Sequence, residues 1–202
     1  MNTLTDSTSA PRVGRATAAG GSARERRDAR LAGAAIVVLA LAAMLPQMVL
    51  ADRWSANEAL ITWLSVGLPL AFVAFGAALW RTGGAHRIVV APMALSALLF
   101  AAATIVDAAT GAREASLGPW PGIVAIVLFS VAGLDVLALG AWRGPARILP
   151  AVAASWALVA VVLTEAIGPE AMWWAAFGTL VLGLVGAGVA IAVRPDLAVR
   201  AS

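Results

Sequence analysis

The chain of 202 residues contains no cysteine and a single histidine, and all 14 of its basic residues are arginine. The absence of cysteine excludes disulfide bonds, thiolate catalysis and iron–sulfur clusters. One histidine cannot build a histidine-based metal site. The sequence also lacks a nucleotide-binding glycine motif, an HExxH motif and a Ser/His/Asp constellation. We therefore expect no enzyme activity, no cofactor and no bound metal.

Charge is also scarce, because 61% of the residues are hydrophobic and only 12% are charged. Soluble domains carry about 25% charged residues, so lipid is the expected solvent and the expected partner of this chain. Six apolar runs are each long enough, at 1.5 Å per residue, to cross a bilayer core of about 30 Å. The sequence predicts an all-α integral membrane protein, a six-transmembrane-helix bundle. The predicted spans are Leu31–Leu50, Leu60–Trp80, Ile88–Ala109, Gly122–Ala141, Ile148–Ile167 and Met172–Val193.

The two ends of the chain differ in character from this membrane domain of residues 31–194. Residues 1–30 are small, polar and rich in arginine, without a hydrophobic period, which is typical of a disordered tail. Residues 195–202 form a second, short tail.

The arginines are distributed unequally between the two sides of a six-span arrangement. Twelve fall on the side of the termini, whereas only Arg53 and Arg113 fall on the other. The positive-inside rule then places both tails in the cytoplasm and the protein in the cytoplasmic membrane. Because the arginines lie at span ends, the net charge of +3 does not indicate a nucleic-acid partner.

The first span has an alternative interpretation as a signal peptide. Arg26, Arg27 and Arg30 would form its basic region, and Val49-Leu50-Ala51 its cleavage site. The apolar stretch is long for a signal peptide and further spans follow, so we favour an uncleaved span. The Arg26-Arg27 pair also lacks the residues that usually follow a twin-arginine signal.

The spans show a hint of threefold repetition, which would make the bundle three antiparallel hairpins. Odd spans begin after Arg30, Arg87 and Arg147, and end near Asp52, Asp107 and Glu165. Positive-inside topology alone would also place an arginine at each of these boundaries, so the repeat stays a hypothesis.

Asp135 is the acid that reaches water least easily, because it lies inside the fourth apolar run. A carboxylate near the centre of a bilayer costs about 2.5–3.5 kcal/mol and usually faces a partner or a cavity. Ser96, Ser155 and Trp156 lie at similar depth and could donate hydrogen bonds to it. Three roles stay open: an interhelical hydrogen bond, proton or cation handling, and contact with a substrate. The one histidine, His86, is interpreted as a surface residue of a loop.

A second group of acids maps to the outer face, opposite most of the arginines. A funnel of carboxylates would concentrate cations, but solvated helix ends explain the same pattern. The candidate outer-face acids are Asp52, Glu58, Asp107 and Glu165.

Small residues recur at helical spacing on the second and sixth spans, where they allow close helix packing. Packing inside the bundle and a face for self-association both fit this pattern. The residues are Gly67, Ala71, Gly183, Gly186, Ala187 and Ala190. Two prolines, Pro46 and Pro69, lie within the first two spans and should kink them.

The layout of residues 31–194 resembles, in length and span count, two families. One comprises the substrate-binding components of energy-coupling-factor vitamin transporters, and the other comprises acid-resistance membrane proteins built from three hairpins. No motif of either family is present. We expect a non-enzymatic accessory, structural or stress-related membrane protein. The alternative is a small transporter or substrate-binding membrane subunit that uses Asp135 and the outer acids.

Overall fold

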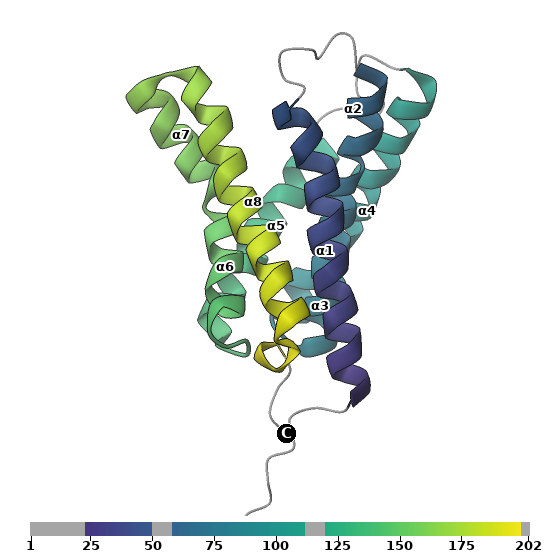
Figure 1. The fold of residues 1–202 in the computed structure, drawn as a ribbon, viewed down its shortest axis with the longest axis vertical. Coiled ribbons are helices and arrows are strands. Elements are labelled where there is room, and N and C mark those ends of the chain that lie inside the picture. Colours follow the sequence, from purple (N-terminus) through teal and green to yellow (C-terminus); the bar gives the residue numbers. More distant parts are fainter. Residues whose placement is uncertain (1–22, 50–57, 112–119, 199–202) are drawn as a thin grey trace, which may run out of the picture.

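The computed structural model describes residues 23–49, 58–111 and 120–198, and these residues form helices without any strand (Figure 1). The helices run roughly along one long direction; α2 continues into α3 and α6 into α7 end to end, and the other successive helices lie side by side (Figure 1). Their order is α1 Ala23–Val49, α2 Glu58–Ser65, α3 Gly67–Thr82, α4 Arg87–Thr110, α5 Trp120–Leu139, α6 Pro145–Ala154, α7 Trp156–Ile167 and α8 Pro169–Val193, followed by the short 3₁₀ helix η2 Pro195–Leu197.

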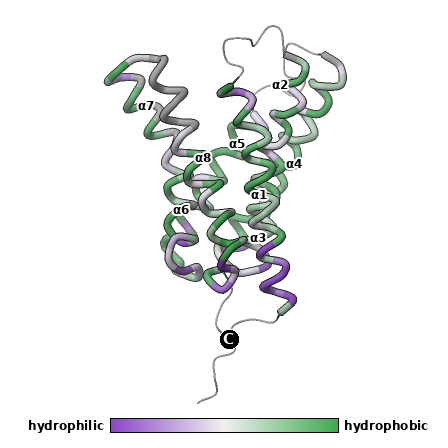
Figure 2. Tube along the Cα trace, in the orientation of Figure 1, coloured by the Kyte–Doolittle hydropathy of each residue, from purple (hydrophilic) through white to green (hydrophobic). Residues whose placement is uncertain are grey.

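Four helical stretches of the described chain are long and apolar enough to cross a membrane. They are Ala23–Gln47, Ala59–Thr82, Arg87–Thr110 and Trp120–Leu139. The hydropathy of the residues agrees with this assignment. Apolar residues cover the helices, and hydrophilic residues gather at the end where α1 begins (Figure 2). The expectation of an all-helical membrane protein is confirmed at this level.

Helix α1 begins at Ala23, eight residues before the predicted start of the first span at Leu31. The added turns are built from arginine, alanine and glutamate, which favour helix. They also contact the bundle. Ala29 is buried, and the carboxylate of Asp28 lies 3.3 Å from the guanidinium of Arg81 on α3. Residues 1–22 of the predicted tail lie outside the described residues.

The predicted second span is interrupted at Val66, between α2 and α3. Proline at position 69 has no N–H to donate to the carbonyl of Ser65, so the regular helical ladder fails at this point. Val66 N–H instead donates to Trp63 O over 3.3 Å, a tighter 3₁₀-type turn. Pro46 lies inside α1, which continues to Val49.

The predicted fifth span, Ile148–Ile167, is also not one continuous helix, which corrects the prediction. It is divided at Ser155 into α6 and α7. The hydroxyl of Ser155 donates to Val152 O over 2.8 Å. The backbone N–H of Ser155 donates to both Ala151 O and Val152 O, each over 3.1 Å. A serine hydroxyl that competes for backbone carbonyls in this way weakens a helix, and no apolar pattern reveals it.

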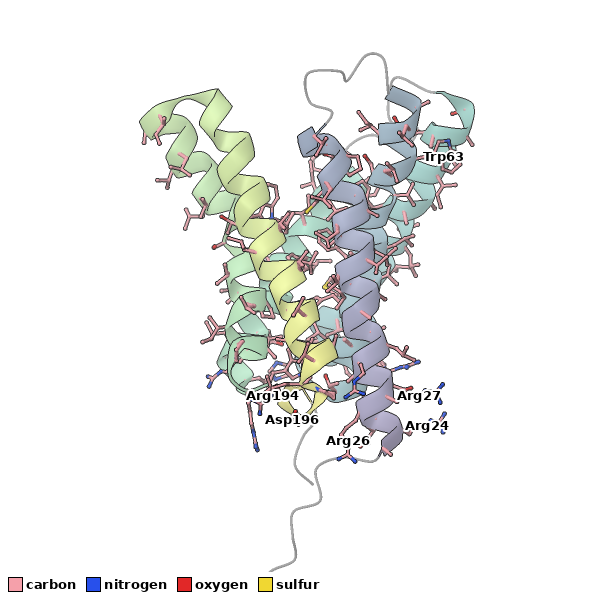
Figure 3. The ribbon with its side chains drawn as sticks, in the orientation of Figure 1. Arg24, Arg26, Arg27, Trp63, Arg194 and Asp196 are labelled. Carbon is pink, nitrogen blue, oxygen red and sulfur yellow. The ribbon has the colours of Figure 1, made fainter. Side chains whose placement is uncertain are left out.

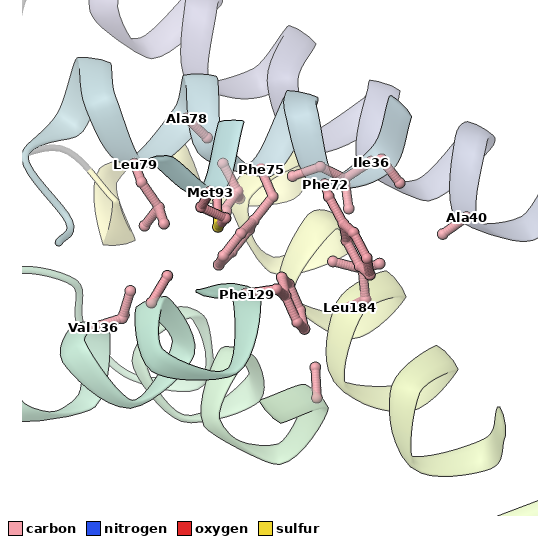
Figure 4. Close-up of a cluster of buried hydrophobic side chains, with 14 of the residues drawn as sticks. Ile36, Ala40, Phe72, Phe75, Ala78, Leu79, Met93, Phe129, Val136 and Leu184 are labelled. Atoms are coloured by element: carbon pink, nitrogen blue, oxygen red, sulfur yellow. The ribbon is translucent and has the colours of Figure 1, made fainter. Parts of the chain in front are cut away.

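Helix α1 packs against α3 and α8, and the remaining contacts follow chain order through α4, α5 and α6 back to α8. The core is aromatic where α3 meets α5. The ring of Phe72 stacks on that of Phe129 at 4.5 Å, and Phe75 meets Phe129 edge-on (Figure 4). Phe75 also meets the ring of Trp142 edge-on, at 6.0 Å. In the described part of the chain every buried core side chain is apolar.

Candidate functional site

Asp135 lies in the last turns of α5 and contacts His86, the residue that precedes α4. Its Oδ2 accepts a hydrogen bond from the backbone N–H of His86 over 2.6 Å. The ring nitrogen Nδ1 of His86 lies 2.8 Å from Oδ1 and 3.1 Å from Oδ2. The aspartate side chain is 16% exposed, whereas the histidine side chain is 64% exposed. The carboxylate is therefore mostly enclosed, and the imidazole covers it on the outside.

The loop between α3 and α4 is shaped to present His86 to this carboxylate. Gly83 ends α3 in the left-handed conformation, with φ of 63°, as a helix C-cap commonly requires. Gly84 then passes over the buried indole of Trp142, where a Cβ atom would lie 2.5 Å from Nε1. Trp142 donates from Nε1 to the hydroxyl of Thr82 over 2.8 Å. This hydrogen bond ties the start of the loop to a buried side chain.

The contact has the chemistry of a helix cap supplied by a neighbouring helix. His86 is the N-cap residue of α4, with extended backbone at φ −67° and ψ 133°. The first N–H groups of a helix have no partner within it, and the helix dipole favours negative charge there. Nδ1 of His86 also lies within hydrogen-bond distance of both carboxyl oxygens, and either a donor or an acceptor role is open to this ring nitrogen. These contacts of Asp135 thus fasten α5 to the start of α4.

This arrangement differs from the predicted neighbourhood of Asp135. The residue lies four positions before the end of α5 at Leu139, which is about 6 Å along a helix rather than deep in the span. Its partner is His86 instead of Ser96, Ser155 or Trp156. Sequence reasoning assigned His86 to the surface, where its ring does lie, but missed that its N–H and Nδ1 meet the aspartate.

The other three residues of the predicted site lie elsewhere in the fold. Ser155 ends α6 and bonds Val152 O, while Ser96 is half-buried in α4. Trp156 begins α7, and its Nε1 is buried without a hydrogen-bond partner among the described residues. A buried N–H donor without a partner is uncommon. The α6–α7 interruption is therefore a second polar feature, beside the contact of Asp135 with His86.

The outer-face acids can be located only in part. Asp107 lies half-buried in the last turn of α4, and Glu165 is exposed on α7. Asp52 and the side chain of Glu58 lie outside the described residues. Within the described ranges, no group of three His, Cys, Asp or Glu residues could hold a metal ion.

The small residues named from the sequence lie where helices of the same chain approach one another. A Cβ atom on Gly67 would meet the carbonyl of Leu39 on α1 at 2.5 Å. A Cβ atom on Gly183 would meet Ala153 Cα on α6 at 2.5 Å, and one on Gly186 would meet Leu149 of the same helix. Ala71 and Ala187 are fully buried and Ala190 is half-buried.

The nine arginines of the described residues lie at or beside the end where α1 begins, here called the arginine end. Several of them contact the last turn of a neighbouring helix. Arg30 Nε donates to Ala192 O on α8 over 3.2 Å, and Arg147 donates to Leu137 O on α5 from both Nε and Nη2. The last carbonyls of a helix lack internal partners, so these guanidinium groups cap α8 and α5. The arginine end comprises Arg24, Arg26, Arg27, Arg30, Arg81, Arg87, Arg143, Arg147 and Arg194.

Comparison with known proteins does not extend this description. No protein-family model, curated protein or solved structure matches the chain.

Proposed function

We propose that the chain is a six-span protein of the cytoplasmic membrane with both termini on the cytoplasmic side and a structural, non-enzymatic role. Four apolar helices support the membrane assignment. The gathering of the described arginines at one end supports the orientation, since positive charge is retained on the cytoplasmic side. In this proposal α2 with α3, and α6 with α7, each cross the membrane as one interrupted span.

The six spans form three hairpins in this proposal: α1 with α2–α3, α4 with α5, and α6–α7 with α8. One repeated contact supports it. Arg87 lies 5.0 Å from the ring centroid of Trp80 on α3, Arg147 caps α5, and Arg30 caps α8. In the second and third hairpins, an arginine near the start of the first helix contacts the end of the preceding hairpin. In the first hairpin, the corresponding arginine contacts the end of the third.

A structural role rests on one observation, the position of Asp135. A proton or cation carrier would use an intramembrane carboxylate that faces a water-accessible path. Here the carboxylate is occupied by the N–H and the ring of His86 at the arginine end. The bundle interior around it is packed with apolar side chains. This arrangement supports the use of Asp135 to hold two helices together.

The test of this role is a flux measurement paired with a stability measurement. Wild type and Asp135→Asn are purified, reconstituted in vesicles and assayed for proton and solute uptake across a broad panel. We expect no flux above protein-free vesicles for either protein. Flux through wild type that disappears in Asp135→Asn, while the melting temperature is kept, would refute the structural role.

Topology is tested separately with reporter fusions. A reporter placed after Ser202 should be active only in its cytoplasmic form. A reporter inserted between Gly111 and Trp120 should be active only in its external form. An external C-terminus would contradict the six-span arrangement.

The alternative function, a small transporter, is favoured by a different observation. Interrupted helices near mid-span can form substrate sites in transporters, and Trp156 at the α6–α7 interruption leaves its buried Nε1 unpartnered within the described residues. If this alternative is correct, Trp156→Phe should abolish uptake of a transported solute with little loss of stability. The structural role predicts that there is no uptake to abolish.

A further inference from the structure

We infer that one side of the arginine end, formed by α1, α3 and α4, is a binding surface for anionic phospholipid headgroups. This inference rests on the proposed membrane location and names a specific partner for it. The surface, here called the headgroup rim, consists of Arg24, Arg27 and Asp28 on α1, Trp80 and Arg81 on α3, and Arg87 on α4.

The arginines of this end differ in how many of their donors stay available. On the other side of the end, Arg147 spends Nε and Nη2 on Leu137 O, and Arg194 lies 3.3 Å from Asp196. This leaves Arg143 there as an exposed arginine whose side chain has no partner among the described residues. Arg24 and Arg27 are both exposed and form no ion pair or hydrogen bond with another described residue. They project to the side of α1 away from Arg194 and Asp196 (Figure 3).

Two contacts link the charges of α1 and α4 to α3. Arg24 and Arg27 are three residues apart and Arg24 and Asp28 four apart, so Arg24 neighbours both of them on the surface of α1. The carboxylate of Asp28 lies 3.3 Å from Arg81, whose side chain is 64% exposed. Arg87 lies over the ring of Trp80, 5.0 Å from its centroid, and is exposed. Four arginines and one aspartate leave the rim with a net charge of about +3.

The start of α1 also reaches the depth of the lipid headgroups. Arg27 precedes Leu31, the predicted start of the first span, by four positions, which is about 6 Å along α1. A headgroup layer is about 5–8 Å deep on each side of the apolar core, so Arg27 falls within it, whereas the backbone of Arg24, about 10 Å from Leu31, lies just beyond it. Trp80, which precedes Arg81 in α3, is 44% exposed, and tryptophan is enriched at the membrane interface. An anionic phosphodiester can therefore accept from the guanidinium groups while its chains lie along α1 and α3.

The experiment measures binding of phosphatidylglycerol and phosphatidylcholine to the full-length protein in a non-ionic detergent, by native mass spectrometry. The rim variant is Arg24→Gln with Arg27→Gln. The control is Arg143→Gln with Arg194→Gln, which removes the same charge from the other side of the same end. Membrane insertion of each protein is checked first, by flotation with phosphatidylcholine vesicles after alkaline extraction.

We expect wild type to prefer phosphatidylglycerol and the rim variant to bind it about fivefold more weakly for each arginine removed. The control should bind almost as wild type does, and both variants should melt at the wild-type temperature without added lipid. Equal weakening in the two variants, or no preference for phosphatidylglycerol, would overturn the rim while leaving the membrane location intact. Competition by millimolar inorganic phosphate would also overturn it, by indicating a site for free anions. Failure of wild type to float would overturn the membrane location itself.

Discussion

Replacement of Gly183 by alanine tests whether α8 packs inside the bundle as described. The added Cβ atom would lie 2.5 Å from Ala153 Cα and 2.6 Å from Ala153 Cβ on α6. Carbon atoms in contact sit about 3.5–4.0 Å apart, so α6 and α8 would have to move apart by about 1 Å. The neighbouring atoms belong to backbone and to a short side chain, and neither can move without its helix.

The cost of this overpacking is about 1–3 kcal/mol. It is offset by about 0.5–1 kcal/mol, because alanine loses less entropy than glycine on forming a helix. The net expectation is a loss of about 1 kcal/mol, within a range of about 0–2.5 kcal/mol, and each kcal/mol lowers the melting temperature by roughly 2–4 °C.

Gly178 offers a matched control on the same helix, five residues away. A Cβ atom there would meet nothing within 4 Å, so Gly178→Ala should be neutral or stabilising. Both variants are compared with wild type by thermal unfolding in detergent, together with their oligomeric state by light scattering. Equal stability of Gly183→Ala and Gly178→Ala would refute the packing of α8 on α6. A change of oligomeric state in Gly183→Ala without loss of stability would show that the small-residue stripe meets a second copy instead.

Two further changes test the loop that carries the candidate site, by the same unfolding assay. Asp135→Leu should lose about 1–2 kcal/mol of stability, because the His86 N–H loses its acceptor. Asp135→Asn keeps an acceptor and should lose less. A leucine variant as stable as wild type would show that this contact does not hold α4 to α5. Trp142→Phe should lose about 2 kcal/mol, since it removes buried volume and the bond to Thr82. The control Trp120→Phe, at a side chain that is 69% exposed, should change stability little, and equal effects of the two substitutions would contradict the buried position of Trp142.

The expected effect of Asp135→Leu depends on tertiary structure. From the sequence, an aspartate within an apolar run indicates a buried carboxyl group, and if that group only packs, leucine in its place would stabilise the bundle. The structure assigns the carboxylate to an N–H that needs an acceptor, which reverses the sign of the prediction. Asp135 and His86 are 49 residues apart, and no periodicity connects residues on a helix and in a distant loop.

Local physics accounts for what the sequence by itself determined. Long apolar runs must become helices in lipid, because only a helix satisfies every backbone hydrogen bond within its own segment. The boundaries of α4 and α5 therefore lie within two residues of those predicted, with Arg87–Thr110 and Trp120–Leu139 against Ile88–Ala109 and Gly122–Ala141. The arginines mark one end of each run, and the small residues mark faces able to pack closely.

The tertiary structure alone decided which groups meet. Glycine spacing permits close approach but does not name the partner, and only the packed bundle sets Gly183 against Ala153 and Gly67 against Leu39. Hydropathy also cannot predict the interruption at Ser155, because a hydroxyl that bonds a carbonyl of its own helix leaves the apolar pattern intact. The pairing of Asp135 with His86 requires α3, α4 and α5 to be in place together, since the contact joins the end of one helix to a loop between two others.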